Sequence, residues 1–143
     1  RKYFYSRYPL MITLGFMLFF CDFLRNRHII FYSVFTAHYL PAYNGKCEHL
    51  HGHTYKLVVK VEGTPDHEGM VIDFIKLKNL VKEEVLVHLD HACLNDVLPV
   101  PSAENISVWV WNKLEALLKT DRYHLYEVEV WETRTSGCVY RGD

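Results

Sequence analysis

The chain has 143 residues and a net charge of −1, and half of its residues are hydrophobic, a size and composition typical of one compact domain. This composition excludes an intrinsically disordered protein, and the balanced charge, without a basic block, gives no support for a nucleic-acid partner. The four cysteines are widely spaced and form no C-x-x-C pair, which favours reduced thiols in a cytoplasmic protein over a disulfide framework.

The N-terminal segment, residues 1–27, differs in character from the rest of the chain. Basic residues precede an apolar run over residues 10–20, a pattern that resembles the core of a signal peptide. The run is too short to cross a bilayer, for which about 20 apolar residues are needed, and Phe19-Phe20 occupies the place of a small-residue cleavage site. We therefore expect an extension of unknown role, packed on the domain or on a neighbouring subunit, or a mis-assigned start. Export or membrane attachment is the less favoured alternative.

The next residues predict two strands. Residues 28–39 are β-branched and aromatic and predict a strand that ends near His38. Residues 41–52 are rich in polar residues and predict a loop. Residues 53–63 alternate between apolar and polar side chains, as a half-buried strand does. The cluster at 64–69 predicts a turn.

Two helices and two further strands complete the expected fold. Asp73 is placed as the cap of a first helix, and a second amphipathic helix is expected after Pro101-Ser102. Strands are expected at about 124–133 and 137–141. The order β-β-α-α-β-β predicts an α+β domain with an antiparallel four-stranded sheet and both helices on one face. Its two open edges predict a homo-oligomer.

The strongest chemical signal is a cluster of histidines around a thiol. His38, Cys47, His51 and His53 fall within sixteen residues. On an extended backbone His51 and His53 project to the same side, in register with the apolar face that continues through Tyr55. An unpaired imidazole there is costly, so a metal ion with a third imidazole from a neighbouring strand is expected. Three protein ligands and one open position are typical of catalytic zinc. If Cys47 were a fourth ligand, the site would be closed and structural.

Two other features place polar groups where chemistry is possible. Asp90 precedes His91 directly after the first helix, where the carboxylate could orient the imidazole, although a plain helix end explains the pair equally well. In the third strand Tyr126, Val128 and Val130 are expected on one side, and the same alternation places Glu132 on that apolar side. A carboxylate there either marks an exposed strand end or awaits a ligand edge with two adjacent N–H donors.

The combination of these motifs resembles the 6-pyruvoyltetrahydropterin synthase superfamily, over about residues 28–143. The spacing Cys47-x-x-x-His51 is similar to its bacterial branch, the 6-carboxy-5,6,7,8-tetrahydropterin synthases of the 7-deazaguanine (queuosine) pathway. The matching segments are Ala37-His38-Tyr-Leu-Pro41, Cys47-x-x-x-His51-Gly-His53, Gly69-Met-Val-Ile-Asp73-Phe74, Leu89-Asp90-His91-x-x-Leu94-Asn95, Pro101-Ser-Ala-Glu104-Asn105 and Glu132-Thr133 with Gly137-Cys-Val-Tyr-Arg-Gly142.

The resemblance implies a tunnelling fold (T-fold), in which trimers close a barrel, two trimers stack, and the active sites lie between subunits. It implies a lyase that converts 7,8-dihydroneopterin triphosphate to 6-carboxy-5,6,7,8-tetrahydropterin with release of acetaldehyde and triphosphate. The roles implied for single residues are zinc ligation by His38, His51 and His53, proton transfer by Cys47 with the pair Asp90 and His91, and anchoring of the pterin ring by Glu132. A pyruvoyl-forming synthase and a non-catalytic zinc or pterin-binding protein are the alternatives.

Overall fold

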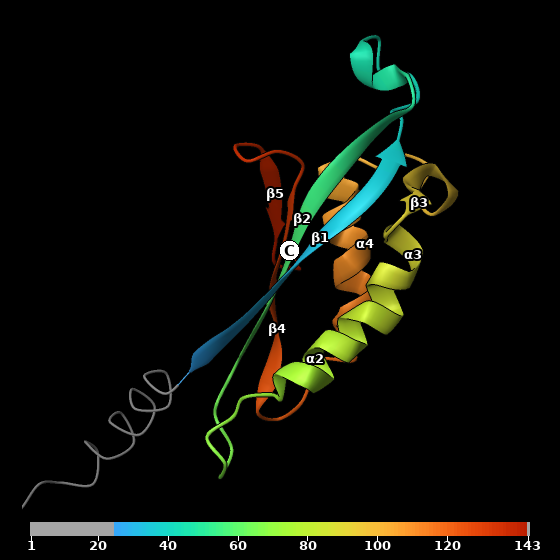
Figure 1. Cartoon of the computed structure of the whole chain (residues 1–143). Coiled ribbons are helices and arrows are strands. Elements are labelled where there is room, and N and C mark those ends of the chain that lie inside the picture. Colours follow the sequence, from blue (N-terminus) through green and yellow to red (C-terminus); the bar gives the residue numbers. More distant parts are fainter. Residues whose placement is uncertain (1–24, 143) are drawn as a thin grey trace, which may run out of the picture.

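The computed structural model describes residues 25–142 and consists of one twisted sheet with its helices packed on a single face (Figure 1). The five strands are β1 (Asn26–His38), β2 (His51–Gly63), β3 (Ala92–Cys93), β4 (Tyr123–Trp131) and β5 (Gly137–Tyr140), and they lie in the order β3-β1-β2-β4-β5. The α+β class and the one-sided helices agree with the expectation from sequence.

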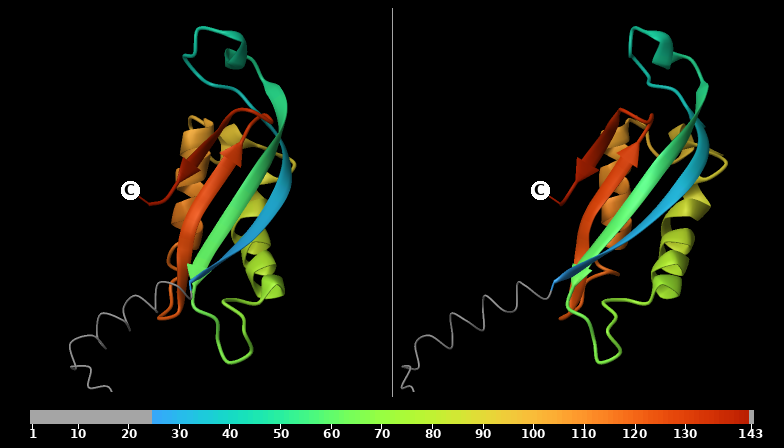
Figure 2. Two further views of the ribbon diagram at one scale, coloured as in Figure 1. Left: turned by 90° about the vertical axis from the view of Figure 1, so that its left-hand side faces the viewer. Right: turned by 60° about the vertical axis from the view of Figure 1, so that its left-hand side comes forward.

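The long hairpin of β1 and β2 forms the middle of the sheet. The two strands pair antiparallel over their full length, from Asn26 opposite Gly63 to His38 opposite His51. Even-numbered residues of β1 and odd-numbered residues of β2 face the helices, as the alternating burial shows. The connecting loop carries a single 3-10 turn, Lys46–Glu48, and extends beyond the end of the sheet (Figure 2).

Two helical segments cover the sheet. The first runs from α2 (Phe74–Val81) through a π-helical turn (Lys82–Leu86) into α3 (Val87–Leu89), and the second is α4 (Ala103–Leu114). The Asp73 carboxylate caps α2 by accepting from the Ile75 and Lys76 amides, and the Ser102 hydroxyl caps α4 by accepting from the Asn105 amide. Both predicted helix starts are therefore confirmed.

The core lies between this face of the sheet and the helices. Side chains that are at most 2% exposed include the following members of β2, β4, α2, the π-helical turn and α4: Leu57, Val59, Val61, Leu77, Val81, Val85, Val110, Leu114 and Val128. Burial of this apolar surface is the main force that holds the sheet and the helices together. No helix among residues 25–142 has the length and apolar character needed to cross a membrane.

The sheet differs from the expected four antiparallel strands. A fifth strand, β3, has only two residues and pairs parallel to β1, so the sheet is mixed. The strand β1 begins at Asn26, two residues before the expected domain boundary, while residues 1–24 of the expected N-terminal extension lie outside the described residues. The T-fold barrel expected from several chains is taken up below as a proposal.

A β-bulge in β4 overturns the expected orientation of Tyr126. The register shifts between Lys60 and Val61, which pair with Glu127 and Leu125, so that Tyr126 is the extra residue. Its ring lies under the Arg27 guanidinium, on the solvent face of the sheet, whereas Val128 and Val130 stay in the core. The bulge restores the alternation for the rest of the strand.

The bulge is followed by a buried carboxylate on the outer face. Glu127 is 3% exposed, and its carboxylate accepts from Lys60 Nζ and Arg141 Nε. Burial opposes ionisation, but these two cationic donors outweigh it and lower the pKa of Glu127. The carboxylate is therefore ionised in the folded protein well into mildly acidic solution.

Replacement of Glu127 by glutamine is expected to destabilise the fold by about 1–3 kcal/mol near neutral pH, because two partly buried cations lose a charged acceptor. A carboxyl group whose pKa is lower in the folded than in the unfolded protein stabilises the fold at pH values above its unfolded pKa, 4.5. This stabilisation is lost as the pH falls through the lower, folded pKa. Urea unfolding of wild type and Glu127→Gln should therefore converge as pH drops below about 4. The exposed Glu83→Gln is the control and should change stability by no more than about 0.5 kcal/mol. A constant difference between wild type and Glu127→Gln from neutral to strongly acidic pH would contradict the prediction.

Candidate metal centre and active site

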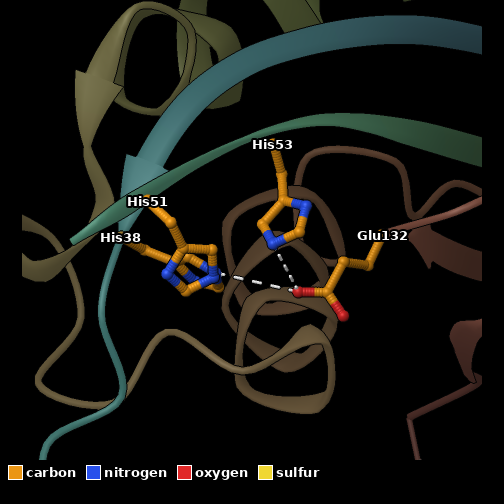
Figure 3. A group of neighbouring side chains, drawn as sticks. All are labelled: His38, His51, His53 and Glu132. Atoms are coloured by element: carbon orange, nitrogen blue, oxygen red, sulfur yellow. Dashed lines mark hydrogen bonds and ion pairs between the residues drawn. The ribbon is translucent and has the colours of Figure 1, made fainter. Parts of the chain in front are cut away.

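Three histidines meet at the end of the hairpin, on the face of the sheet that carries the helices. His38 is the last residue of β1 and pairs directly with His51, the first residue of β2. His53 lies two positions further along β2 on the same side, and its ring centroid is 4.8 Å from that of His51. The strand register therefore brings the expected third imidazole from the neighbouring strand, and Figure 3 shows the three rings with Glu132.

The donor atoms have the separations of a small metal site. Within residues 25–142, one ligand atom each of His38, His51, His53 and Glu132 lies within 4.8 Å of the others. Tetrahedral zinc with bonds of about 2.0–2.1 Å requires donors roughly 3.3 Å apart. The distance from His38 Nε2 to His51 Nε2 is 3.1 Å, and that from His53 Nε2 to Glu132 Oε1 is 3.2 Å. These two separations are close to that value, while His38 Nε2 and Glu132 Oε1, 3.7 Å apart, are further from each other, so the group could hold a metal ion.

Backbone carbonyls fix the orientation of two of the rings. His38 Nδ1 lies 2.9 Å from the Pro101 carbonyl oxygen, and His51 Nδ1 lies 2.7 Å from that of His49. A carbonyl only accepts, so each Nδ1 carries a proton, and the Nε2 atoms of the two rings face each other at 3.1 Å. The hydrogen bonds to the backbone are those that orient histidine ligands in metal sites.

Burial keeps the innermost imidazole neutral. His38 is 2% exposed, and desolvation lowers its pKa, with the neighbouring His51 and His53 acting in the same direction. The Pro101 carbonyl and Glu132 oppose this shift without reversing it. A neutral imidazole is the form that binds a metal ion.

Glu132 lies just after β4, at the edge of the histidine cluster. Its Oε1 is 3.2 Å from His53 Nε2 and 3.7 Å from His38 Nε2, while no hydrogen bond from residues 25–142 engages its Oε2. Glu132 therefore lies on the helix-facing side of the sheet, as predicted. The fourth donor within metal reach is Glu132 rather than Cys47, so the structure gives no support to a closed site in which Cys47 completes the shell.

Tyr55 is a site residue that the sequence analysis placed only in the apolar face. It is 3% exposed, and its hydroxyl donates to Glu132 Oε1 at 3.2 Å and lies 3.4 Å from both ring nitrogens of His38. Burial and the Glu132 carboxylate raise the pKa of Tyr55, and the charges of Cys47 and Glu104 add to this effect. The hydroxyl is therefore a permanent donor. A buried tyrosine hydroxyl needs a hydrogen-bond partner. The position of Tyr55 on the apolar face, in line with His51 and His53, is the one sequence feature that could have identified it as a site residue.

Tyr55→Phe is expected to weaken metal binding about tenfold while leaving the fold intact, because it removes the hydrogen bond that holds Glu132 beside the histidines. Competition with a chromogenic chelator measures the dissociation constant. Tyr32→Phe is the matched control, since it removes a hydroxyl that donates to the Lys78 carbonyl, away from the cluster. Equal metal affinity in both variants would show that the Tyr55 hydroxyl does not position the site.

Cys47 lies in the 3-10 turn of the loop above the cluster. It is a free, half-buried cysteine, and the amide of Leu40 donates to its carbonyl oxygen at 2.7 Å, which closes the loop. Among the described residues Cys47 is not one of the four grouped donors, and its expected proton-transfer role stays a prediction.

Asp90 and His91 form the expected pair but lie apart from the cluster. Asp90 Oδ2 is 3.1 Å from His91 Nδ1, and Asp90 Oδ1 accepts from the Phe35 amide at 2.9 Å. His91 has φ 57°, an uncommon conformation for a residue other than glycine, and its side chain is 76% exposed. Within residues 25–142, no hydrogen bond, ion pair or ring contact joins this pair to Cys47 or to the three histidines.

Comparison with known proteins agrees with this geometry. Residues 32–143 match the family model of 6-pyruvoyl tetrahydropterin synthase, so the chain belongs to that family of pterin synthases.

Particular relatives carry two different names. The chain is 34% identical over 136 residues to the 6-carboxy-5,6,7,8-tetrahydropterin synthase of Haemophilus influenzae, covering 77% of this chain and 94% of that protein. It is 40% identical over 116 residues to the Synechocystis protein of the same name, covering 76% and 88%. It is also 38% identical over 105 residues to the 6-pyruvoyl tetrahydrobiopterin synthase of Dictyostelium discoideum, covering 69% and 76%.

The fold is shared with solved structures of the family. The 6-pyruvoyl tetrahydropterin synthase of Caenorhabditis elegans superimposes with a TM-score of 0.74 at 28% identity, covering 83% of this chain and 96% of that one.

Proposed function

We propose that the protein is a zinc-dependent lyase that converts 7,8-dihydroneopterin triphosphate to 6-carboxy-5,6,7,8-tetrahydropterin, with release of acetaldehyde and triphosphate, in 7-deazaguanine (queuosine) biosynthesis. The observation that carries the proposal is the group of three histidine Nε2 atoms that could hold a metal ion, with the Glu132 carboxylate at its edge. The two bacterial relatives named 6-carboxy-5,6,7,8-tetrahydropterin synthase support this lyase activity.

Each residue of the candidate site has a proposed role in this reaction. His38, His51 and His53 hold the zinc ion, which when bound supplies a Lewis acid to the oxygens of the substrate side chain. Glu132 binds the two N–H donors of the pterin edge, which orients the side chain of the substrate toward the cluster. Cys47 removes a proton from the adjacent carbon, and His91, oriented by Asp90, transfers a proton on the opposite face.

Assembly into a homo-oligomer completes this arrangement. The pair Asp90 and His91 has no contact with Cys47 within one chain, so a neighbouring subunit brings it to the site. The outer face of β1 exposes large apolar side chains that a second chain would cover, namely Ile29 (52%), Phe31 (69%) and Phe35 (50%). We propose the trimer of the T-fold, closed into a barrel through its open sheet edges, with two trimers stacked as a hexamer.

The catalytic unit of this proposal is residues 28–143, extended at its start by the first residues of β1. We place it in the cytoplasm, in keeping with its unpaired cysteines, Cys47, Cys93 and Cys138. The role of residues 1–27 can be tested by measuring how much of the protein partitions into membranes, for the full chain and for a chain that starts at residue 25.

A pyruvoyl-forming synthase is the second candidate, because the Dictyostelium relative carries that name. Both reactions use the same substrate, so the products separate them. Zinc-loaded protein is incubated with 7,8-dihydroneopterin triphosphate, and the pterin is identified by mass. Release of acetaldehyde with a carboxypterin product supports the first candidate. A pyruvoyl product without acetaldehyde identifies the second, and binding without turnover identifies a zinc or pterin-binding protein.

A further inference from the structure

A second concave site lies on the other face of the sheet, next to the candidate metal centre. It is a pocket of about 490 Å³ lined by Thr54, Lys56, Trp131, Thr133 and Arg134. Lys56 and Trp131 pair directly across β2 and β4, and Thr133 and Arg134 follow in the turn toward β5. Its volume is in the range of small-ligand sites.

The pocket has the charge of an anion site. Two cations line it, and no carboxylate does. Among the described residues no acidic side chain lies within ion-pair distance of Lys56 or Arg134, whereas Lys60 and Arg141 on the same sheet are paired with Glu127. The nearest acidic side chain along β4, Glu129, is already held by Lys60 and by the indole N–H of Trp131. Two unneutralised cations thus share one small pocket.

The Trp131 ring, which lines the pocket with the two cations, is held in place, and two threonines of the lining supply hydroxyl groups. Trp131 Nε1 donates to Glu129 at 2.6 Å, and the chain at Gly137 approaches the ring so closely that a Cβ there would lie 2.7 Å from Trp131 Cδ2. The Lys56 ammonium lies 5.5 Å from the centroid of Phe31, which supports its stem along the sheet. The hydroxyls of Thr54 and Thr133 can donate to a phosphate oxygen, and the two cations of the pocket are donors only.

The pocket is one residue away from the candidate metal centre on both strands. Thr54 follows His53 and Thr133 follows Glu132, and consecutive Cα atoms are about 3.8 Å apart. Because side chains alternate along a strand, the histidines and the pocket occupy the two faces of the same strand end. A ligand whose reacting carbons lie over the histidines reaches the pocket by passing around the end of β4, where the strand stops at Trp131.

We propose that this pocket binds phosphate groups, and that Lys56 and Arg134 hold the triphosphate end of the substrate during turnover. The proposal rests on the proposed function for the identity of the substrate. A free phosphate chain, including the triphosphate product, has the same chemistry and is distinguished by experiment.

The test uses the full-length, zinc-loaded protein and the variants Lys56→Gln, Arg134→Gln and their double variant. Lys76→Gln is the matched control, because Lys76 is an exposed lysine of α2 on the opposite layer. Binding of inorganic triphosphate is measured by calorimetry, and KM and kcat are measured for 7,8-dihydroneopterin triphosphate. Zinc content and thermal unfolding verify that each variant is folded and loaded.

Each single variant is expected to weaken triphosphate binding and raise KM about tenfold, with kcat within twofold of wild type, and the double variant is expected to show a larger loss. Loss of triphosphate binding together with a raised KM assigns the pocket to the substrate's phosphate end. Loss of triphosphate binding with an unchanged KM would leave an anion site but overturn the role in holding substrate. Unchanged triphosphate binding and KM in the double variant would overturn the proposal altogether. Calorimetry needs no turnover, so a failure of the proposed lyase activity is detected separately, by absence of product in wild type.

Discussion

His51→Ala is expected to abolish specific metal binding and, with it, catalytic turnover. His51 contributes one of three Nε2 atoms, and its ring is oriented by the His49 carbonyl, so its removal leaves two imidazoles and a carboxylate that no longer surround an ion. Loss of a supporting contact alone weakens a metal site by about 10–100-fold, and loss of a ligand exceeds this range. Metal content after dialysis, by mass spectrometry, measures the effect.

His51 is the best of the three positions for this test because its side chain is only half-buried, whereas His38 is 2% exposed and its truncation would leave a hole in the core. His67→Ala, in the turn before α2, is the control and should retain the metal. Metal that binds the native fold also stabilises it, so zinc should raise the unfolding temperature of wild type and of His67→Ala but not of His51→Ala. One tightly bound ion per chain in His51→Ala would show that the histidine cluster is not the metal centre.

The arrangement of the histidines could be predicted from sequence because it depends on local geometry. Side chains two apart on a strand share a face, which determined the placement of His51 and His53. An antiparallel hairpin then places the end of the preceding strand opposite the start of the next, which brings His38 to His51. Glu132 was placed correctly for the same reason, since alternation holds along β4 beyond the bulge.

The errors lie where no periodic pattern exists. A bulge inserts one residue without a signal in the sequence, so Tyr126 was assigned to the wrong face. The strand β3 has two residues, too few to show an alternation, and its parallel pairing depends on where the first helix ends. The bounds of the other strands shifted by one or two residues, as strand ends commonly do.

Contacts between distant segments could not be predicted from one strand's pattern. The Tyr55 hydroxyl contacts Glu132 across 77 residues of sequence, and the pocket of Lys56 and Arg134 depends on the pairing of β2 with β4. The position of Asp90 and His91, away from Cys47 in a single chain, is a further example. It is the feature of the candidate site that most depends on assembly.

Cys47→Ala is expected to lower kcat by about 10³-fold while the metal is retained. The thiol is not one of the four grouped donors, so its loss is expected to remove the proposed proton-transfer group and leave the histidines in place. General acid–base groups contribute about 10²–10⁴-fold, which sets the expected size. Cys138→Ala is the control, since the Cys138 sulfur lies in β5, 3.6 Å from the Ser107 hydroxyl, and is not among the grouped donors. Loss of the metal in Cys47→Ala would instead identify the sulfur as a ligand and favour a closed, non-catalytic site.

Mixing Cys47→Ala with His91→Ala chains tests whether two subunits build one site. Each variant alone is expected to be nearly inactive, because each lacks one of the two proton-transfer groups in every site. If Cys47 and His91 of a site come from different chains, random reassembly of equal amounts gives about a quarter of the sites both groups, and activity returns to that fraction of wild type. Refolding the two variants together and separately, followed by the acetaldehyde assay, measures this recovery. Activity no greater than the sum of the separately refolded variants would place both groups of each site on one chain, and the separation of Asp90 and His91 from the metal centre would then require a movement within the subunit.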